Sequence, residues 1–373
     1  MNDDAPKLAI LGGGQLGRML ALSAIPLGVD VFSLDPVDGA PAGAVSTLTV
    51  GALDDLDALH TTAAGADVVT FEWEGVPAAP LRTLVAEGSV VRPSVDALEV
   101  SQDRIDEKTT FRRLGIPVAE FAPVDDPTEL VGAVETVGTP AILKTRRGGY
   151  DGKGQATVDA PADAPTAGRA LRDRGPLILE RRIAFDRELS IIAVRGVDGE
   201  IRTWPLVENQ HRGGILRTSR APAAGIDDAL QASATAHVRA VLEHFDYVGV
   251  LTLELFQVGD RLLANEMAPR VHNSGHWTIE GARTSQFENH VRAVLGWPLG
   301  PTDAPGPSVM INCVGALPEP TEVLAVPGAH LHRYGKSLRP GRKVGHVTVT
   351  GPDATELDRR VAAVRAHLPA DVG

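Results

Sequence analysis

Cysteine is almost absent from the chain: Cys313 is the one thiol among 373 residues. A single thiol excludes an internal disulfide framework and a zinc site built from several cysteines, and it is typical of a protein kept in a reducing cytoplasm. Because Cys313 lies in the apolar stretch CVGAL, we expect it to be buried and structural. The N-terminal stretch MNDDAPK is acidic and lacks the basic start and apolar core of a secretion signal.

Blocks of basic residues and long uncharged runs are missing as well. The formal net charge is -12, with 36 Lys and Arg against 48 Asp and Glu. We therefore expect no nucleic-acid partner, because binding to backbone phosphates needs a basic face. No uncharged run is long enough to cross a bilayer, so we expect a cytoplasmic protein with no membrane contact.

Glycine is plentiful, at 39 residues, and the N-terminal part alternates short apolar strands with helical stretches. The stretches KLAILG, VDVFSLD, DVVTFEW and SVVRP predict strands of a parallel sheet in an α/β, Rossmann-like domain. Ligands bind at the carboxyl ends of such strands. Here those ends carry Gly12–Gly17, Asp35 and Phe71–Glu74.

The first glycine loop has the spacing of a dinucleotide-binding fingerprint. Gly12, Gly14 and Gly17 follow a strand and open a helix, and Asp35 ends the next strand. An NAD-dependent dehydrogenase is therefore one candidate function, although it leaves the motifs described below unexplained. Two interpretations of Asp35 stay open: contact with a substrate, or capping of the glycine loop.

The pattern of elements predicts three units along the chain. The pattern at 94–115 predicts one long amphipathic helix that begins the second unit. The composition of 158–168 predicts a Pro/Ala linker or mobile loop. We expect an N-terminal Rossmann-like domain at 1–98, a central α+β domain at 99–300 with a mobile glycine-loop lobe at about 120–183, and a small C-terminal β-rich domain at 301–373.

A second glycine loop, LKTRRGGYDGKGQ at 143–155, lies between two predicted strands. Its backbone N–H groups could close around phosphate oxygens, with Lys144 adding a charge at the end of the first strand. It is not a Walker A loop, because no Gly-Lys-Ser/Thr opens a helix. A plain hairpin turn is the alternative, but the crowding of polar side chains on one loop favours phosphate binding.

Two carboxylates, Glu254 and Glu266, stand on neighbouring predicted strands joined by a turn at Gly259-Asp260. Glu254 interrupts an apolar strand, which is costly unless the carboxylate meets a cation. Oxygen ligands at this spacing suit Mg²⁺ that bridges nucleotide phosphates. The alternative is a pair of exposed strand glutamates.

The densest positive charge of this acidic chain lies at Lys336, Arg339, Arg342 and Lys343. One interpretation is a pocket for a phosphate monoester. A solvated surface loop is the other.

Together these motifs resemble the ATP-grasp superfamily and, closely, the N5-carboxyaminoimidazole ribonucleotide synthetases, the PurK family. GGGQLGRM, TFEWE, GGYDGKGQ, NQHRGGIL, NEMAPRVHNSGHWT and PGRKVGH occur in family order over nearly the whole chain. The resemblance implies an ATP-grasp fold and a ligase of purine biosynthesis. Such a ligase joins bicarbonate to the exocyclic amine of 5-aminoimidazole ribonucleotide, through carboxyphosphate, and cleaves ATP to ADP and phosphate. It also implies Mg²⁺ (or Mn²⁺), small-molecule substrates and a homodimer.

The resemblance implies roles for particular residues as well. Contact with the reacting groups falls to Tyr150, Asp151, Arg270 and Asn265, and the metal ligands are Glu254 and Glu266. The ATP-binding set comprises Arg104, Lys144, Gly149, Tyr150, Asp151, Gly152, Lys153, Gly154, Gln155, Glu180, Arg181, Arg182, Ile183, Glu188, His211, Asn265 and Glu266. The acceptor would be held by Gln15, Leu16, Glu72, Asn273, His276, Lys336, Arg342 and Lys343, the last three at its 5′-phosphate.

Two further alternatives concern the reaction itself. A formate-dependent glycinamide ribonucleotide transformylase carries Glu where this chain has Gln15, and its late motif lacks NSGHW. A non-catalytic nucleotide-binding module is disfavoured by the presence of Glu254, Glu266 and Arg270.

Overall fold

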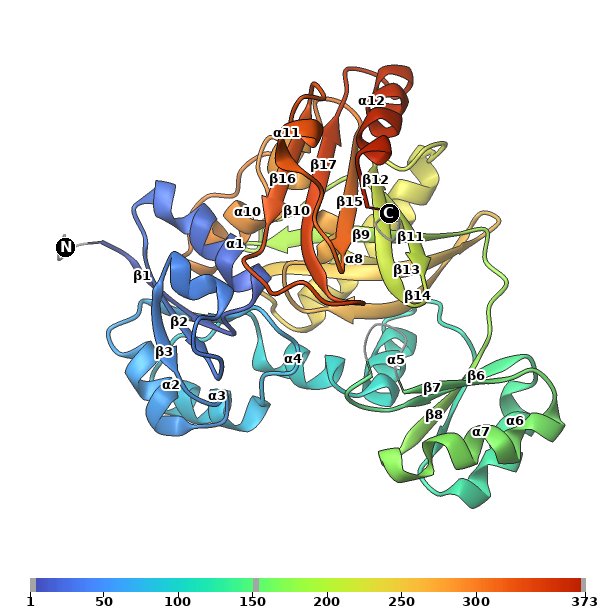
Figure 1. Cartoon of the computed structure of the whole chain (residues 1–373). Coiled ribbons are helices and arrows are strands. Elements are labelled where there is room, and N and C mark those ends of the chain that lie inside the picture. Colours follow the sequence, from blue (N-terminus) through green and yellow to red (C-terminus); the bar gives the residue numbers. More distant parts are fainter. Residues whose placement is uncertain (1–4, 150–153, 370–373) are drawn as a thin grey trace.

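In the computed structural model, which describes residues 5–149 and 154–369, the chain forms three β-sheets with helices packed against them (Figure 1). The N-terminal sheet and the sheet of the small lobe lie at opposite sides of Figure 1, and the central sheet runs between and above them. This mixed α/β architecture confirms the predicted fold class.

The N-terminal sheet is parallel, as predicted, with the strand order β3-β2-β1-β4. Helix α1 follows β1 directly, so the glycine loop between them lies at the carboxyl end of β1. The stretch SVVRP is not a strand; it contributes one parallel bridge from Val91 to Val69. The elements are β1 (Lys7–Leu11), α1 (Gln15–Ala24), β2 (Asp30–Asp35), β3 (Thr47–Val50), α2 (Leu56–Ala63), β4 (Val68–Phe71) and α3 (Ala78–Ala86).

The predicted single helix at 94–115 is wrong, because it is broken into α4 (Val95–Ser101) and α5 (Arg104–Arg113). Asp103 breaks it: its carboxylate accepts a hydrogen bond from the Ile105 N–H at 3.0 Å and so caps the start of α5. The break turns Arg104 and the rest of α5 toward the central sheet.

The small lobe is a four-stranded sheet in the order β5-β8-β6-β7, with antiparallel neighbours and two helices on one face. The predicted linker at 158–168 is wrong in its second half. Ala164, Ala167 and Leu171 form an apolar stripe at helical spacing that packs on the sheet. The elements are β5 (Phe121–Val124), α6 (Leu130–Val137), β6 (Ala141–Thr145), β7 (Gln155–Val158), α7 (Ala164–Leu171) and β8 (Leu177–Arg181).

The central sheet contains the predicted hairpin of β13 and β14, which turns at Gly259. Helix α8 packs on this sheet. Among the described residues no helix is both long and apolar enough to cross a membrane. The elements are β9 (Arg187–Arg195), β10 (Ile201–Thr203), β11 (Val207–Arg212), β12 (Ile215–Ala221), α8 (Asp228–His244), β13 (Gly249–Val258) and β14 (Arg261–Ala268).

The C-terminal strands do not form a separate sheet. β12 pairs with β15 in antiparallel register, Thr218 opposite Ile311, so the central sheet continues as β12-β15-β17-β16. The loop before β17 carries Lys336, Arg339 and Arg342, and we call it the basic loop. It is thereby fixed to the same sheet as the β13–β14 hairpin. The elements are α9 (Thr278–Gly281), α10 (Gln286–Val294), β15 (Ser308–Val314), α11 (Pro320–Val323), β16 (Ala329–Arg333), β17 (Lys343–Thr350) and α12 (Ala354–Ala366).

Candidate active site

A pocket lies where the small lobe meets the central sheet. Apolar side chains from both bodies, among them Ile142 of β6, Phe256 of β13 and Ala264 of β14, form much of its wall. The other lining residues are Lys108, Ala119, Lys144, Glu180, Arg181, Arg182, Ile183, Phe185 and Asn265.

Two ammonium groups meet one buried carboxylate in this pocket. The Glu180 Oε2 atom lies 3.0 Å from Lys144 Nζ and 3.3 Å from Lys108 Nζ. Burial opposes ionisation of Glu180, but the two lysines outweigh it and lower the pKa of that carboxyl to about 2. These ion pairs join Lys144 and Glu180 of the small lobe to Lys108 of α5.

The two predicted metal-ligand residues face one another. Glu254 and Glu266 are paired directly across β13 and β14. Burial, then the charge of Glu266, raises the pKa of Glu254 to about 7. Two carboxylates paired in this way could serve as two ligands of a divalent cation, so this donor set fits magnesium.

Basic and imidazole side chains surround this carboxylate pair. Arg104 donates to Glu266 Oε2 at 2.9 Å and to the Gly149 carbonyl at 3.1 Å. Burial opposes ionisation of Glu266, but Arg104 outweighs it and lowers the pKa of that carboxyl. Glu188 and His211, which are predicted nucleotide residues, lie on neighbouring strands. His211 Nδ1 is 2.6 Å from Glu188 Oε2. Burial opposes protonation of His211, but the hydrogen bond to Glu188 outweighs it and raises the pKa of that ring.

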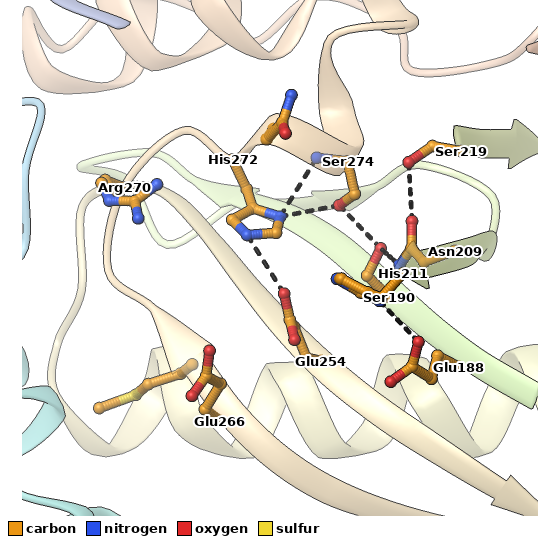
Figure 2. A network of polar contacts seen from close by, with 12 residues as sticks. Glu188, Ser190, Asn209, His211, Ser219, Glu254, Glu266, Arg270, His272 and Ser274 are labelled. Atoms are coloured by element: carbon orange, nitrogen blue, oxygen red, sulfur yellow. Dashed lines mark hydrogen bonds and ion pairs between the residues drawn. The ribbon is translucent and has the colours of Figure 1, made fainter. Parts of the chain in front are cut away.

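His272 contacts Glu254, one of the two predicted metal ligands, and was missed by the sequence reasoning. Its Nε2 atom lies 3.3 Å from Glu254 Oε1 (Figure 2). Burial lowers the pKa of His272 well below its usual value, so the ring is neutral. The residue stands inside the motif NEMAPRVHNSGHWT, and a histidine so close to Glu266 in sequence was the available signal.

Arg270 connects the central sheet to the N-terminal domain. It follows β14 and forms an ion pair with Glu74, which follows β4. The Arg270 side chain is 14% exposed and that of Glu74 is 34% exposed, so the pair is partly shielded from water. Glu74 was also missed by the sequence reasoning, although it belongs to the motif TFEWE.

The first glycine loop is filled by carboxylates of its own domain. Glu72 accepts from the N–H groups of Gly14 at 2.9 Å and Gly17 at 3.1 Å. Asp35 accepts from the N–H groups of Gly13 at 2.8 Å and Val37 at 2.9 Å, so it caps the loop. Negative charge already occupies these donors, which argues against a dinucleotide pyrophosphate in the same place.

The predicted acceptor residues come from distant parts of the chain. Gln15 at the start of α1 accepts a hydrogen bond from Lys336, which joins the N-terminal domain to the basic loop. Arg342 is partly buried and donates to Ser337 Oγ at 2.7 Å, and Lys343 begins β17. Leu16 packs in the apolar core behind Gln15.

Asn273 and His276 are both buried and lie in the segment that follows β14. Asn273 exchanges hydrogen bonds of 3.0 and 2.7 Å with the Asn312 side chain. His276 is fully buried, and within the described part of the chain its Nε2 atom has no hydrogen-bond partner. Four predicted residues of the second glycine loop, Tyr150, Asp151, Gly152 and Lys153, lie outside the described residues.

The hinge residues of the predicted ATP set have described contacts. Arg182 pairs with Asp159 at 2.7 Å, and Arg181 donates to the Val137 carbonyl at 3.2 Å. Their side chains therefore bind the lobe, which leaves the backbone of this segment to face the pocket. At the other end of the glycine loop, Gln155 is paired with Lys144 in the β6–β7 ladder.

The lobe, the central hairpin and the phosphate-type loop define an ATP-grasp protein. The chain matches the family model of the ATP-grasp domain over residues 109–287 and that of the ribonucleotide synthetase preATP-grasp domain over 6–102. It also matches the phosphoribosylaminoimidazole carboxylase C-terminal domain over 308–360.

Comparison with whole proteins gives the particular family. N5-carboxyaminoimidazole ribonucleotide synthase of Pseudomonas aeruginosa is 47% identical over 364 residues, which are 98% of this chain and 100% of that protein. The crystal structure of the Thermus thermophilus synthetase is 53% identical, with a TM-score of 0.93 over 97% of this chain and 98% of that one. The Aspergillus clavatus synthase in complex with ADP and 5-aminoimidazole ribonucleotide is 34% identical, with a TM-score of 0.89 over 97% and 98%.

The chain therefore belongs to the N5-carboxyaminoimidazole ribonucleotide synthase family and is an ATP-dependent ligase. This result confirms the predicted family and enzyme class. It overturns the transformylase, dehydrogenase and non-catalytic alternatives.

Proposed function

We propose that the chain joins bicarbonate to the exocyclic amine of 5-aminoimidazole ribonucleotide, using ATP and forming N5-carboxyaminoimidazole ribonucleotide in purine biosynthesis. The ion pair of Arg270 with Glu74 carries this proposal. It links the strand that carries Glu266 to the domain that holds Gln15, which supports a phosphate-handling site next to an acceptor site. Relatives with this reaction in their names match the chain along its whole length.

ATP would bind between the small lobe and the central sheet. The apolar pocket would take adenine, with backbone groups of residues 181–183 along its edge. Glu188 would accept from the ribose hydroxyls, and His211 would hold Glu188 in place through their 2.6 Å contact. Arg104 and Lys144 would neutralise phosphate charge, as would backbone groups of the loop 149–155.

Glu254 and Glu266 would hold Mg²⁺ together with phosphate oxygens, since their carboxylates face each other across two strands. When bound, the ion neutralises the charge that develops as the terminal phosphoryl group leaves ADP. Asn265 would add an amide oxygen or N–H group beside that phosphoryl group.

Bicarbonate is a poor electrophile, which explains why ATP is consumed. A bicarbonate oxygen attacks the terminal phosphorus, the bond to ADP breaks, and carboxyphosphate forms. The acceptor amine then attacks the carboxyl carbon, or the CO₂ released from it, as phosphate leaves and the amine loses a proton. Arg270 would steady the transferred phosphate, and Tyr150 and Asp151 would close over the reacting groups and exclude water.

The acceptor would bind between the N-terminal domain and the basic loop. Lys336, Arg342 and Lys343 would hold its 5′-phosphate by charge-assisted hydrogen bonds. Gln15, beside Lys336, would contact the nucleotide together with the other members of its set, which are Leu16, Glu72, Asn273 and His276.

The enzyme is a homodimer, and it works in the cytoplasm. Its domains divide at residues 1–98, 99–300 and 301–373, with the C-terminal strands added to the central sheet.

ADP release in the presence of bicarbonate and Mg²⁺, with and without 5-aminoimidazole ribonucleotide, tests the proposed reaction. We expect the acceptor to stimulate ADP release, and N5-carboxyaminoimidazole ribonucleotide to form in equal amount. Glu266→Gln should lower turnover by about 10²-fold or more, since it removes a charge at the transferred phosphate. Glu243→Gln, on an exposed face of α8, is the control. Wild-type turnover in Glu266→Gln at saturating Mg²⁺ would contradict the metal assignment, and ADP release indifferent to the acceptor would contradict the reaction.

A further inference from the structure

A row of buried hydroxyl and amide groups leads from the middle of the central sheet to His272 (Figure 2). Ser219 lies 2.8 Å from Asn209, Asn209 lies 3.0 Å from Ser190, and Ser190 lies 2.8 Å from Ser274. Ser274 Oγ in turn lies 2.8 Å from His272 Nδ1. We call Ser219, Asn209, Ser190 and Ser274 the polar row. Its three serines are fully buried and Asn209 is 5% exposed.

The hydrogen bonds of the polar row all run in one direction. The Ser219 hydroxyl donates to Asn209 Oδ1, the Asn209 amide donates to Ser190 Oγ, and the Ser190 hydroxyl donates to Ser274 Oγ. A hydroxyl has one proton to donate. Since Ser274 accepts from Ser190, its own proton is left for His272 Nδ1.

A second contact supports this direction. The backbone N–H of Ser274 also points to His272 Nδ1, at 3.3 Å. A backbone N–H can only donate, so this contact also favours Nδ1 as an acceptor without the ring proton. The reverse direction, with Nδ1–H donating to Ser274 Oγ, would set two donors against each other.

The direction of these hydrogen bonds determines which proton His272 presents to Glu254. A neutral histidine carries one ring proton, and with Nδ1 unprotonated that proton is on Nε2. His272 Nε2 lies 3.3 Å from Glu254 Oε1. The ring can then donate to this oxygen, fix the rotation of the carboxylate and leave the other oxygen, Oε2, for a cation.

We propose that Ser190 and Asn209 are positioning residues: they hold His272 in the tautomer with its proton on Nε2, and His272 orients Glu254. The effect on the reaction depends on the proposed function, in which Glu254 is a metal ligand. The tautomer itself does not depend on it. Polar partners outside a metal's own ligands commonly change metal affinity in this way.

Nitrogen NMR of protein labelled with ¹⁵N-histidine reads the tautomer directly. The chain has 11 histidines, so the His272 signals are assigned from their loss in His272→Gln. We expect an unprotonated Nδ1 and a protonated Nε2 in the wild-type protein. A protonated Nδ1 in that spectrum overturns the proposal without any further variant.

Asn209→Asp is the variant that reverses the row. An ionised aspartate has no proton to donate, so the Ser190 hydroxyl turns toward it. Ser274 then donates to Ser190 and can only accept from the ring, so a proton on Nδ1 is favoured over the single 3.3 Å contact from the Ser274 N–H. In the double variant Ser190→Ala/Asn209→Asp the link is cut, and the wild-type signal should return. An unchanged signal in folded Asn209→Asp, or a change that persists in the double variant, overturns the proposal.

Kinetics separate this inference from the proposed function. In Asn209→Asp we expect the Mg²⁺ concentration for half-maximal ADP release to rise about tenfold, with little change in the KM for the acceptor. Ser33→Ala, which removes a buried hydroxyl bonded to Ser46 in the N-terminal domain, is the matched control. A reversed tautomer with unchanged Mg²⁺ dependence supports the positioning of His272 and overturns the metal role of Glu254.

Discussion

The pKa of a buried carboxyl group in this protein depends on the charged groups beside it. Glu180 meets two lysines, and its pKa falls to about 2. Glu107, also buried, has only the Met267 N–H as a described hydrogen-bond donor, at 2.7 Å. Burial and the nearby Glu266 raise the pKa of Glu107 to about 8. The same residue type is therefore an anion in one place and a neutral acid in another.

Glu107→Gln should make stability less dependent on pH. Between its ordinary pKa of 4.5 and about 8, the folded protein binds this proton and the unfolded chain does not, so stability falls as pH rises. Glutamine keeps the Met267 contact and cannot titrate. From pH 5.5 to 7.5, urea unfolding should show a loss of unfolding free energy that is roughly 2–3 kcal/mol smaller in the variant. Equal losses in both proteins would place an ionised Glu107 in the folded state.

Arg342→Ala should weaken binding of the acceptor. A charge-assisted contact to phosphate contributes roughly 1.5–3 kcal/mol, so the KM for 5-aminoimidazole ribonucleotide should rise by about ten- to a hundredfold. The KM for ATP should stay nearly constant, since Arg342 lies in the basic loop, where it contacts Ser337. For the nucleoside that lacks the 5′-phosphate, the mutation should raise the KM by a smaller factor. A rise in the KM for ATP alone would assign the basic cluster to the nucleotide site.

Residue-level prediction succeeded where pattern and chemistry agree. The pairing of Glu254 with Glu266 followed from two strands, a turn and two carboxylates that interrupt apolar runs. Lys108 was not predicted, because its helix has a polar sequence that suggests an exposed face. In fact its side chain is 1% exposed and bonds the Asn265 carbonyl at 2.9 Å. That partner lies far along the chain, where no local pattern indicates it.

At the scale of elements, the sequence correctly predicted a glycine loop between a strand and helix α1. The dinucleotide-binding function that the glycine spacing suggested was wrong. The spacing of its glycines reflects close approach of Glu72, not of a dinucleotide. A Cβ atom at Gly14 would lie 2.5 Å from Glu72 Oε1, and one at Gly12 would lie 2.6 Å from Glu72 Cγ. Helix boundaries were predicted less well, since the cap at Asp103 looks like any other acidic position in a polar helix.

Gly14→Ala should therefore destabilise the N-terminal domain. The added methyl must displace Glu72, which costs roughly 1–3 kcal/mol. Gly132→Ala is the matched control, because Gly132 lies in α6 with open space around it and alanine favours helix. Thermal unfolding should give a lower Tm for the first variant and an equal or higher Tm for the second. Equal melting of Gly14→Ala and wild type would mean that Glu72 does not fill the loop.

At the scale of the whole molecule, single buried contacts hold the units together. His290 of α10 joins Thr70 of β4 at 2.8 Å and accepts from the Val250 N–H of β13 at 3.1 Å. Because Nδ1 accepts, Nε2 carries the proton and donates to Thr70. Burial lowers the pKa of His290 to about 3. The parallel N-terminal sheet and the central hairpin were predictable from sequence, but this junction was not.

The junction should weaken in acid. Below its ordinary pKa of 6.5, His290 takes a proton in the unfolded chain and not in the folded one, so stability falls as pH decreases toward 3. Between pH 7 and 5 this residue should account for a loss of roughly 2 kcal/mol in unfolding free energy. His290→Gln should be less stable at pH 7 and lose less on acidification, and exposed His60→Gln should behave as wild type. Parallel losses in all three proteins would remove His290 from the explanation.

The continuation of the central sheet into β15 bears on how the chain is made. Synthesis releases the N-terminal part first, so β12 emerges before the strand that pairs with it. Until residues 308–314 arrive, β12 is an open edge with unpaired N–H and C=O groups, the kind of edge on which separate chains pair and aggregate. A chain that stops early would keep the residues of the pocket between the small lobe and the central sheet and also this exposed edge. The C-terminal strands thus serve the growing protein as a cover against its neighbours.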